Sequence, residues 1–188
     1  MRIFLSILIL IFTHQSWTKA DDISDFEIEG ISVGDSLLSH FTKKEIIENI
    51  SYNYEETNKK FTSVDFYNLS NKYEFIQFHY KTNDKNYEIY SIDGIFSWDK
   101  PPTVCNSERL KINNQISNAF TDLKYEEFLN SDMASRRGFM DANEYYFSNG
   151  DFIQLTCYKY KDKYSDYRNH GRLGIVRKEL DDWIVSIE

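Results

Sequence analysis

The sequence predicts an α+β fold in which an antiparallel sheet of about six strands packs against two or three helices. Helical and strand-like patterns alternate in the order helix, three strands, helix, three strands, helix. The connections within each group of strands are too short for the crossovers that parallel strands need, so we expect antiparallel meanders. The repeated order also fits a duplicated helix-plus-meander unit with halves 31–100 and 101–188, although the halves share no visible sequence identity.

Residues 1–20 have the features of a secretory signal peptide. A basic start is followed by an apolar run from Ile3 to Phe12 and by Thr18-Lys19-Ala20, a typical cleavage site. The apolar run is about ten residues long, whereas a membrane-spanning helix needs about 20. An uncleaved amphipathic anchor is the alternative. We therefore expect a periplasmic or secreted protein, with residues 21–188 as a single α+β domain and no membrane insertion after the signal is removed.

The chain is acidic, with 30 Asp and Glu residues against 22 Lys and Arg residues. Loss of Arg2 and Lys19 with the signal peptide would remove two positive charges and change the formal net charge from −8 to −10. The remaining basic residues are scattered, whereas nucleic acids and anionic membranes bind clustered basic residues. The charge pattern therefore argues against both as partners.

The segment before the first long strand predicts two short helices. Asp35 or Ser36 can cap the first helix, and Thr42 with Glu45 forms a capping box for the second. The first helix would carry Leu37, Leu38 and Phe41, and the second is expected to turn Ile46, Ile47 and Ile50 inward.

Three strands are predicted next, over 61–67, 73–80 and 87–98, with Asp93-Gly94 breaking or bulging the third. Alternation in the second strand places Phe75, Gln77 and His79 on one face. The opposite face carries Ile76, Phe78 and Tyr80. We interpret His79 as a tolerated surface residue.

A helix is predicted after these strands, with Asn106 or Ser107 as its cap and an apolar stripe at helical spacing. The stripe consists of Ile112, Ile116, Ala119, Phe120 and Leu123. The polar stretch 124–141 is interpreted as a long loop.

The last part of the chain predicts a hairpin, with strands over 144–147 and 152–158 around the turn Asn149-Gly150. A strand over 172–177 follows. A short helix from Glu179 then closes the chain, and it is expected to bury Leu180, Trp183 and Ile184.

The two cysteines, Cys105 and Cys157, are expected to form a structural disulfide, as paired cysteines do in exported proteins. Cys157 shares the aliphatic side of its strand with Ile153 and Leu155, so it should point into the core. The bond would restrict the unfolded chain by roughly 4 kcal/mol. A redox-active or metal-binding thiol pair is the alternative, which the lack of a Cys-x-x-Cys motif disfavours. Since the bond would couple the second half to the link between the halves, we favour one continuous sheet.

The sequence contains no recognisable catalytic or cofactor motif. It has neither a Gly-x-Ser-x-Gly element nor a phosphate-binding glycine loop. His40, His79 and His170 are not at metal-ligand spacing, and a disulfide would remove the free thiol that a cysteine nucleophile needs. We therefore expect no cofactor, no metal and no catalytic residue.

Two groups of residues are candidates for contact with a ligand or partner. Tyrosine rings can stack on a sugar or a peptide, or they can form a hydrophobic lid over a sheet edge. The candidates of this kind are Tyr158, Tyr160, Tyr164 and Tyr167. Arg136 and Arg137 form either an anion-binding pair or an ordinary exposed loop tip.

The stretch from Ile28 to Leu38, followed by Phe41 and Glu45-Ile46, carries a resemblance to known proteins. With Cys105 before the central helix and Thr156-Cys157-Tyr158 in a strand, it resembles a family of small exported proteins of unassigned function from marine alphaproteobacteria. This resemblance covers essentially the whole mature chain and implies no catalytic residue. The order of elements resembles, more weakly, the outer-membrane assembly lipoproteins and the beta-lactamase-inhibitor-like fold. The chain lacks the lipid-attachment cysteine of those lipoproteins.

The residues favour a non-enzymatic binding or protein-interaction module whose partner is an unknown protein or small ligand. The alternative is a small hydrolase or ligand-sequestering protein with a site built from distant residues. A pocket that holds His79 or His170 beside a carboxylate with a perturbed pKa would favour the alternative. A shallow, aromatic-rimmed groove or an exposed strand edge would favour the module.

The signal peptide generates a first testable prediction. Because residues 1–20 should be removed on export, N-terminal sequencing of the exported protein should begin at Asp21 or a neighbouring residue. Recovery of mature protein that still begins at Met1 would contradict the prediction.

Overall fold

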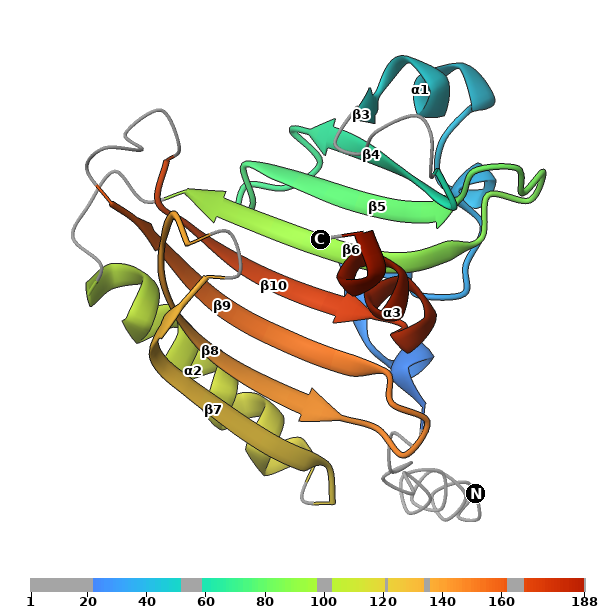
Figure 1. Ribbon diagram of the computed structural model, residues 1–188. Helices are drawn as coiled ribbons and strands as arrows, with labels where there is room; N and C mark the ends of the chain where they lie inside the picture. Colours follow the sequence, from blue (N-terminus) through green and yellow to red (C-terminus); the bar gives the residue numbers. More distant parts are fainter. Residues whose placement is uncertain are drawn as a thin grey trace, which may run out of the picture.

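The structure is a computed structural model that describes residues 22–51, 59–97, 103–120, 122–133, 136–161 and 168–187. Its main feature is an antiparallel sheet of eight strands in the order β3-β4-β5-β6-β10-β9-β8-β7 (Figure 1). The strands are β3 (Ile50–Ser51), β4 (Phe61–Tyr67), β5 (Phe75–Lys81), β6 (Ile89–Ser97), β7 (Lys124–Asp132), β8 (Gly138–Tyr146), β9 (Phe152–Tyr160) and β10 (His170–Val176). The predicted signal peptide, Tyr164 and Tyr167 lie outside the described residues.

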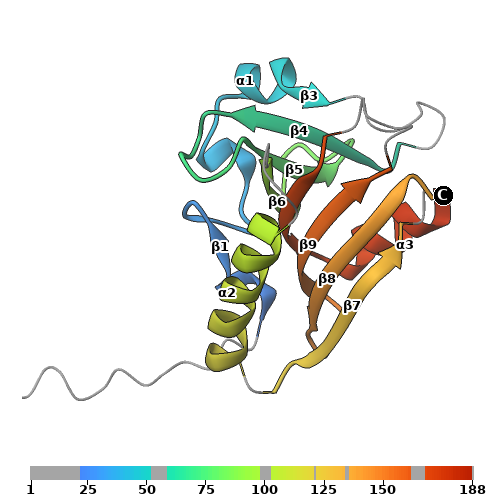
Figure 2. The same ribbon diagram turned by 90° about the vertical axis from the view of Figure 1, so that its left-hand side faces the viewer.

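Helices lie on both faces of this sheet (Figure 2). The α-helices are α1 (Lys43–Glu48), α2 (Thr103–Ala119) and α3 (Lys178–Ile187). The chain before α1 forms two short 3-10 helices, η1 (Ile23–Asp25) and η2 (Leu37–Ser39), and a small sheet of β1 (Glu27–Ile28) and β2 (Ile31–Ser32). Within the described ranges, no helix is both long and apolar enough to cross a membrane.

The larger hydrophobic core lies between one face of the sheet and a layer formed by α2, α1 and the N-terminal segment. It contains Leu37 and Ile46 from the N-terminal part, Ile116 from α2, and apolar residues of the strands such as Ile76 and Ile153. We call the sheet face that carries this core the inner face. A smaller core lies on the opposite, outer face, where α3 covers one end of the strands. Its members are Phe61, Tyr90, Phe152, Val176, Leu180 and Trp183.

The α+β class and the antiparallel meanders are confirmed, but the sheet has eight strands rather than about six. The two strands that were missed, β3 and β7, are the two edges. β3 has only two residues, and β7 lies within the polar stretch 124–141, for which the sequence predicts a loop. Most side chains of β7 are exposed, so the strand lacks the apolar alternation by which a half-buried strand is recognised.

The predicted faces of β5 are confirmed, but the interpretation of His79 as a surface residue is wrong. Ile76, Phe78 and Tyr80 pack in the inner core, and His79 on the outer face is only 2% exposed. The predicted irregularity in β6 is also displaced. The strand runs without a break through Asp93 and Gly94, and its bulge lies at Tyr90, where the pairing with β5 shifts register.

The capping predictions for the N-terminal helices are confirmed. Ser36 accepts a hydrogen bond from the backbone N–H of Leu38, and Thr42 and Glu45 form the reciprocal capping box at the start of α1. Ile46 is fully buried, but Ile47 is 52% exposed, contrary to the prediction that it faces inward. In a helix of six residues, neighbouring positions point about 100° apart, so both cannot face the core.

Helix α2 begins and ends earlier than predicted, at Thr103 and Ala119. Asn106 and Ser107 are therefore inside the helix and do not cap it. Ile116 is buried, and Ile112, Phe120 and Leu123 pack against the inner core, as the stripe predicts. The side chain of Ala119 lies outside the described residues. The helix can start earlier because the two residues directly before Thr103 are Pro101 and Pro102, and proline is compatible with the start of a helix. Between Thr103 and Ala119 there is no proline or glycine to interrupt it.

Cys105 and Cys157 lie at disulfide-bonding distance, with their Cα atoms 6.0 Å apart. Both side chains are buried, Cys157 on the same face of β9 as Ile153 and Leu155. The pair thus joins the first turn of α2 to the strand two places from the far edge of the sheet. The pairing of Cys105 with Cys157 is as the sequence predicts, and the bond closes a loop of 52 residues that includes β7 and β8.

Replacing both cysteines with alanine should lower the free energy of unfolding by roughly 2–4 kcal/mol, since the unfolded chain regains the freedom of that loop. Urea denaturation of the double variant and the parent protein measures the difference. Thiol titration of the denatured, unreduced parent protein is the accompanying control. Two free thiols per chain would show that the bond does not form.

Candidate functional site

A connected polar network lies in the middle of the outer face, beside the part covered by α3. It consists of His79 on β5, Ser91 and Asp93 on β6, and Arg172 on β10. The Ser91 hydroxyl donates to Asp93 Oδ2 over 3.1 Å, and Arg172 Nε donates to Asp93 Oδ1 over 2.7 Å. Both oxygens of a carboxylate that is only 1% exposed are therefore satisfied.

His79 is neutral in this network. Burial lowers its pKa to about 4, although the nearby Asp93 carboxylate acts in the opposite direction. Its Nδ1 lies 2.8 Å from Ser91 Oγ. Because the Ser91 proton goes to Asp93, the hydrogen-bond network assigns a proton to Nδ1, which donates to the serine oxygen.

These three residues share the side-chain types of a serine-protease triad but not its geometry. In a triad the histidine bridges serine and aspartate through its two different nitrogens. Here Nδ1 of His79 faces both Ser91 and Asp93, and the serine proton is held by the carboxylate. All three side chains are buried, so Ser91 cannot act as a nucleophile on a bound substrate.

The Asp93–Arg172 pair depends on a glycine in the neighbouring strand. Gly174 lies directly opposite Asp93 in the β6–β10 pairing. A Cβ atom at Gly174 would come within 2.6 Å of Asp93 Oδ1, so a side chain here would displace the carboxylate. Burial lowers the pKa of Arg172, but Asp93 and the Tyr158 hydroxyl outweigh it, and the pKa is raised. Arg172 therefore stays charged over the whole pH range in which the protein would be studied.

A cavity of about 320 Å³ opens on the outer face next to Arg172, at the end of the strands away from α3. It lies across the junction of the two meanders, between β5 and β6 on one side and β9 and β10 on the other. The residues that line it are Glu74, Phe75, Gln77, Ile95, Tyr158, Tyr160, Arg168, His170 and Arg172. Its volume is at the lower end of the range for small-molecule sites.

Several of the lining side chains are held in place by neighbours. The rings of Tyr158 and His170 lie 4.7 Å apart at an interplanar angle of 32°. His170 Nδ1 donates to the Arg168 carbonyl oxygen over 3.1 Å, and burial lowers the pKa of this histidine. Arg168 also forms an ion pair with Glu74. The cavity wall is thus built from fixed rings and paired charges.

The structure brings together some of the candidate contact residues and separates others. Tyr158 and Tyr160 both line the cavity. Arg136 and Arg137 are exposed in the connection between β7 and β8 and do not line it. Arg172 and Gln77 were not singled out from the sequence. The signal for Arg172 was strand alternation, because it shares a face of β10 with His170.

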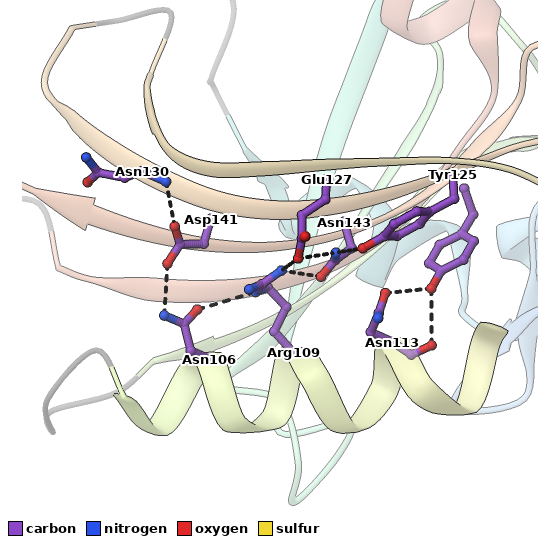
Figure 3. Close-up of polar contacts among 9 residues, drawn as sticks. Asn106, Arg109, Asn113, Tyr125, Glu127, Asn130, Asp141 and Asn143 are labelled. Carbon is purple, nitrogen blue, oxygen red and sulfur yellow. Dashed lines mark hydrogen bonds and ion pairs between the residues drawn. The ribbon is translucent and has the colours of Figure 1, made fainter. Parts of the chain in front are cut away.

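A second polar cluster lies on the inner face, under α2 (Figure 3). Arg109 is 4% exposed and donates to Asn143, Glu127 and Asn106. Two further links to the helix are made, from Asn106 to Asp141 and from Tyr145 to Asn113. The sequence offered a signal, since Arg109 lies between Cys105 and Ile112 on the inward side of the helix. The cluster is closed by the helix and fastens α2 to the sheet.

The cavity presents aromatic rings, an imidazole and guanidinium groups. None of its described lining residues is Ser, Thr, Cys or Lys, and the carboxylate of Glu74 is paired with Arg168. Among the described residues, no group of three or more His, Cys, Asp or Glu side chains could hold a metal ion. The arrangement can stack a ring, accept hydrogen bonds and present a guanidinium.

Comparison with protein-family models, with curated proteins and with solved structures found no match. The resemblance to small exported proteins of unassigned function therefore stays a prediction that rests on the sequence.

Acid should destabilise the fold through His79. Its pKa is about 4 in the folded chain and 6.5 in a model peptide, so between these values only the unfolded chain binds a proton. The stabilisation is complete above pH 6.5 and is lost as the pH falls towards 4, by roughly 3 kcal/mol. Urea denaturation across this range should show a flatter pH dependence for His79→Asn than for the parent.

The difference in pH dependence between His79→Asn and the parent isolates His79, because the carboxylates that titrate in the same range are present in both proteins. His40→Gln is the matched control, because His40 is exposed beside Asp35. The control should keep the parental pH dependence. Equal slopes for His79→Asn and the parent would refute a buried neutral histidine.

Proposed function

We propose that this protein is an exported, non-enzymatic binding module whose ligand occupies the cavity on the outer face. The supporting observation is the composition of the wall. Fixed aromatic rings, contributed by Tyr158, His170 and Phe75, stand beside the charged side chain of Arg172, which a buried carboxylate holds in position. Apolar and aromatic surface combined with fixed polar groups is typical of ligand sites.

The rival proposal is a small hydrolase with a site built from distant residues. The presence of His170 and Glu74 in one cavity favours it. Three observations favour the binding module instead: Glu74 is ion-paired, His170 donates to a backbone carbonyl, and the described lining contains no nucleophile of the usual types.

Export and a duplicated origin are further parts of the proposal. The cysteine pair at bonding distance fits a non-cytoplasmic compartment, periplasmic or extracellular. Each half of the chain consists of a helix followed by an antiparallel meander, and the last strands of both, β6 and β10, meet in the middle. A cavity at the junction of two related units agrees with a ligand site assembled from distant segments.

Binding is tested with the mature chain and a library of small ring compounds that includes neutral, anionic and cationic members. Ligand-detected NMR should find saturable binding for some of them. Ile95→Trp should weaken that binding at least tenfold, because the larger side chain fills the cavity. Val185→Trp is the matched control, since it adds the same ring to an exposed position on α3. If no compound binds, or if Ile95→Trp binds like the parent, the cavity is not a ligand site.

A further inference from the structure

We propose that the ligand is a small aromatic oxyanion, which places its carboxylate or phosphate group on Arg172 and its ring against Tyr158 and His170. This inference rests on the proposed function and names the chemical class that the cavity selects. Three features carry it: the way Arg172 is held, the balance of charge that the cavity presents, and the arrangement of its rings.

Arg172 is held so that part of its guanidinium faces the cavity. Its Nε donates to Asp93, yet its side chain remains 26% exposed and lines the cavity. A guanidinium has five N–H donors, so the bond from Nε to Asp93 leaves donors for a ligand. Because Gly174 has no side chain, the Asp93 carboxylate has room to lie behind the guanidinium. The guanidinium is therefore oriented before a ligand arrives, which reduces the ordering cost of binding.

The charge presented to the cavity is positive. Asp93 is buried behind Arg172 and is not among the lining residues, while Glu74 is neutralised by its ion pair with Arg168. His170 is uncharged near neutral pH, because burial lowers its pKa. Arg172 is the remaining charge. An oxyanion would accept hydrogen bonds from its planar fork, whereas a cation would be repelled by the same guanidinium.

The rings of the cavity favour a planar ligand. Tyr158 and His170 lie against each other, Tyr160 is 6.1 Å from the same histidine, and Phe75 and Ile95 add apolar surface. Aromatic faces of this kind contribute stacking as well as buried area. Tyr158 and Arg172 are diagonal neighbours across β9 and β10 and line the same cavity, so a ring that stacks on the tyrosine brings a substituent close to the guanidinium.

The test uses three compounds of the same shape: benzoate, benzamide and benzamidine, which are anionic, neutral and cationic. Calorimetric titration of the mature chain should show benzoate binding at least tenfold more tightly than benzamide, with no saturable binding of benzamidine. Phenyl phosphate, titrated in parallel, shows whether a phosphate or a carboxylate is preferred. This ranking needs no variant and is decisive by itself.

The double variant Asp93→Asn with Arg172→Gln assigns the preference to Arg172. Removing both charges avoids leaving Asp93 buried without a partner, which would destabilise the fold. The variant should bind benzoate and benzamide equally. The control is Glu108→Gln with Lys111→Gln, which removes an exposed ion pair of α2 with the same change in net charge. It should keep the parental preference, and circular dichroism should show parental folding for both.

The outcomes separate this inference from the proposed function. If benzamide binds as tightly as benzoate, or if the folded double variant keeps the preference for benzoate, the oxyanion assignment is wrong while the cavity remains a ligand site. If none of the ring compounds binds the parent protein, both are wrong. A benzoate preference in the parent that is lost in the double variant supports the assignment.

Discussion

The pairing of β6 with β10 is the contact on which the rest of the structure depends. These strands come from meanders that α2 separates in the chain, and they pair continuously from Ser97 opposite His170 to Ser91 opposite Val176. Without this pairing, each meander would end in a long unpaired edge. The register also sets the polar network, because it puts Gly174 opposite Asp93 and makes Arg172 the diagonal neighbour of that carboxylate. The same hydrogen bonds that close the sheet therefore assemble the site.

Arg109 and Arg172 show different uses of a costly group. Replacing a buried ion pair by well-packed apolar residues is often neutral or stabilising, so such a pair is weak evidence for a role in stability. Arg109 is enclosed by α2, β7 and β8, and its bonds fix the helix on the sheet. Arg172 is anchored on one side by Asp93 and faces a cavity on the other. Its anchoring orients a charge towards solvent, which a purely structural pair would not require.

The parts of the fold that were predictable are those with a one-sided apolar pattern. Strands β4, β5, β9 and β10 and helix α3 show that pattern, and so does the disulfide side of β9. The edges were missed because β3 is short and β7 is exposed on both faces. The burial of His79 could not be predicted, because it depends on Ser91, a partner on another strand that no local pattern of β5 reports. The helical spacing of Arg109 places it on the inward side of α2, but its partners Asn143 and Glu127 come from distant strands.

The position of the cavity follows from the lengths of the elements. Eight strands spaced about 4.8 Å apart span roughly 34 Å, whereas the ten residues of α3 span about 15 Å. On the described part of the outer face, α3 is the single helix, and it covers the end at Phe61, Phe152 and Val176. The strands beyond it must carry side chains that tolerate water or find polar partners. The Asp93 network and the ring-lined cavity meet this requirement. The cavity therefore lies on the part of the outer face that α3 does not cover, and Arg172, which the buried Asp93 holds in position, is accessible from it.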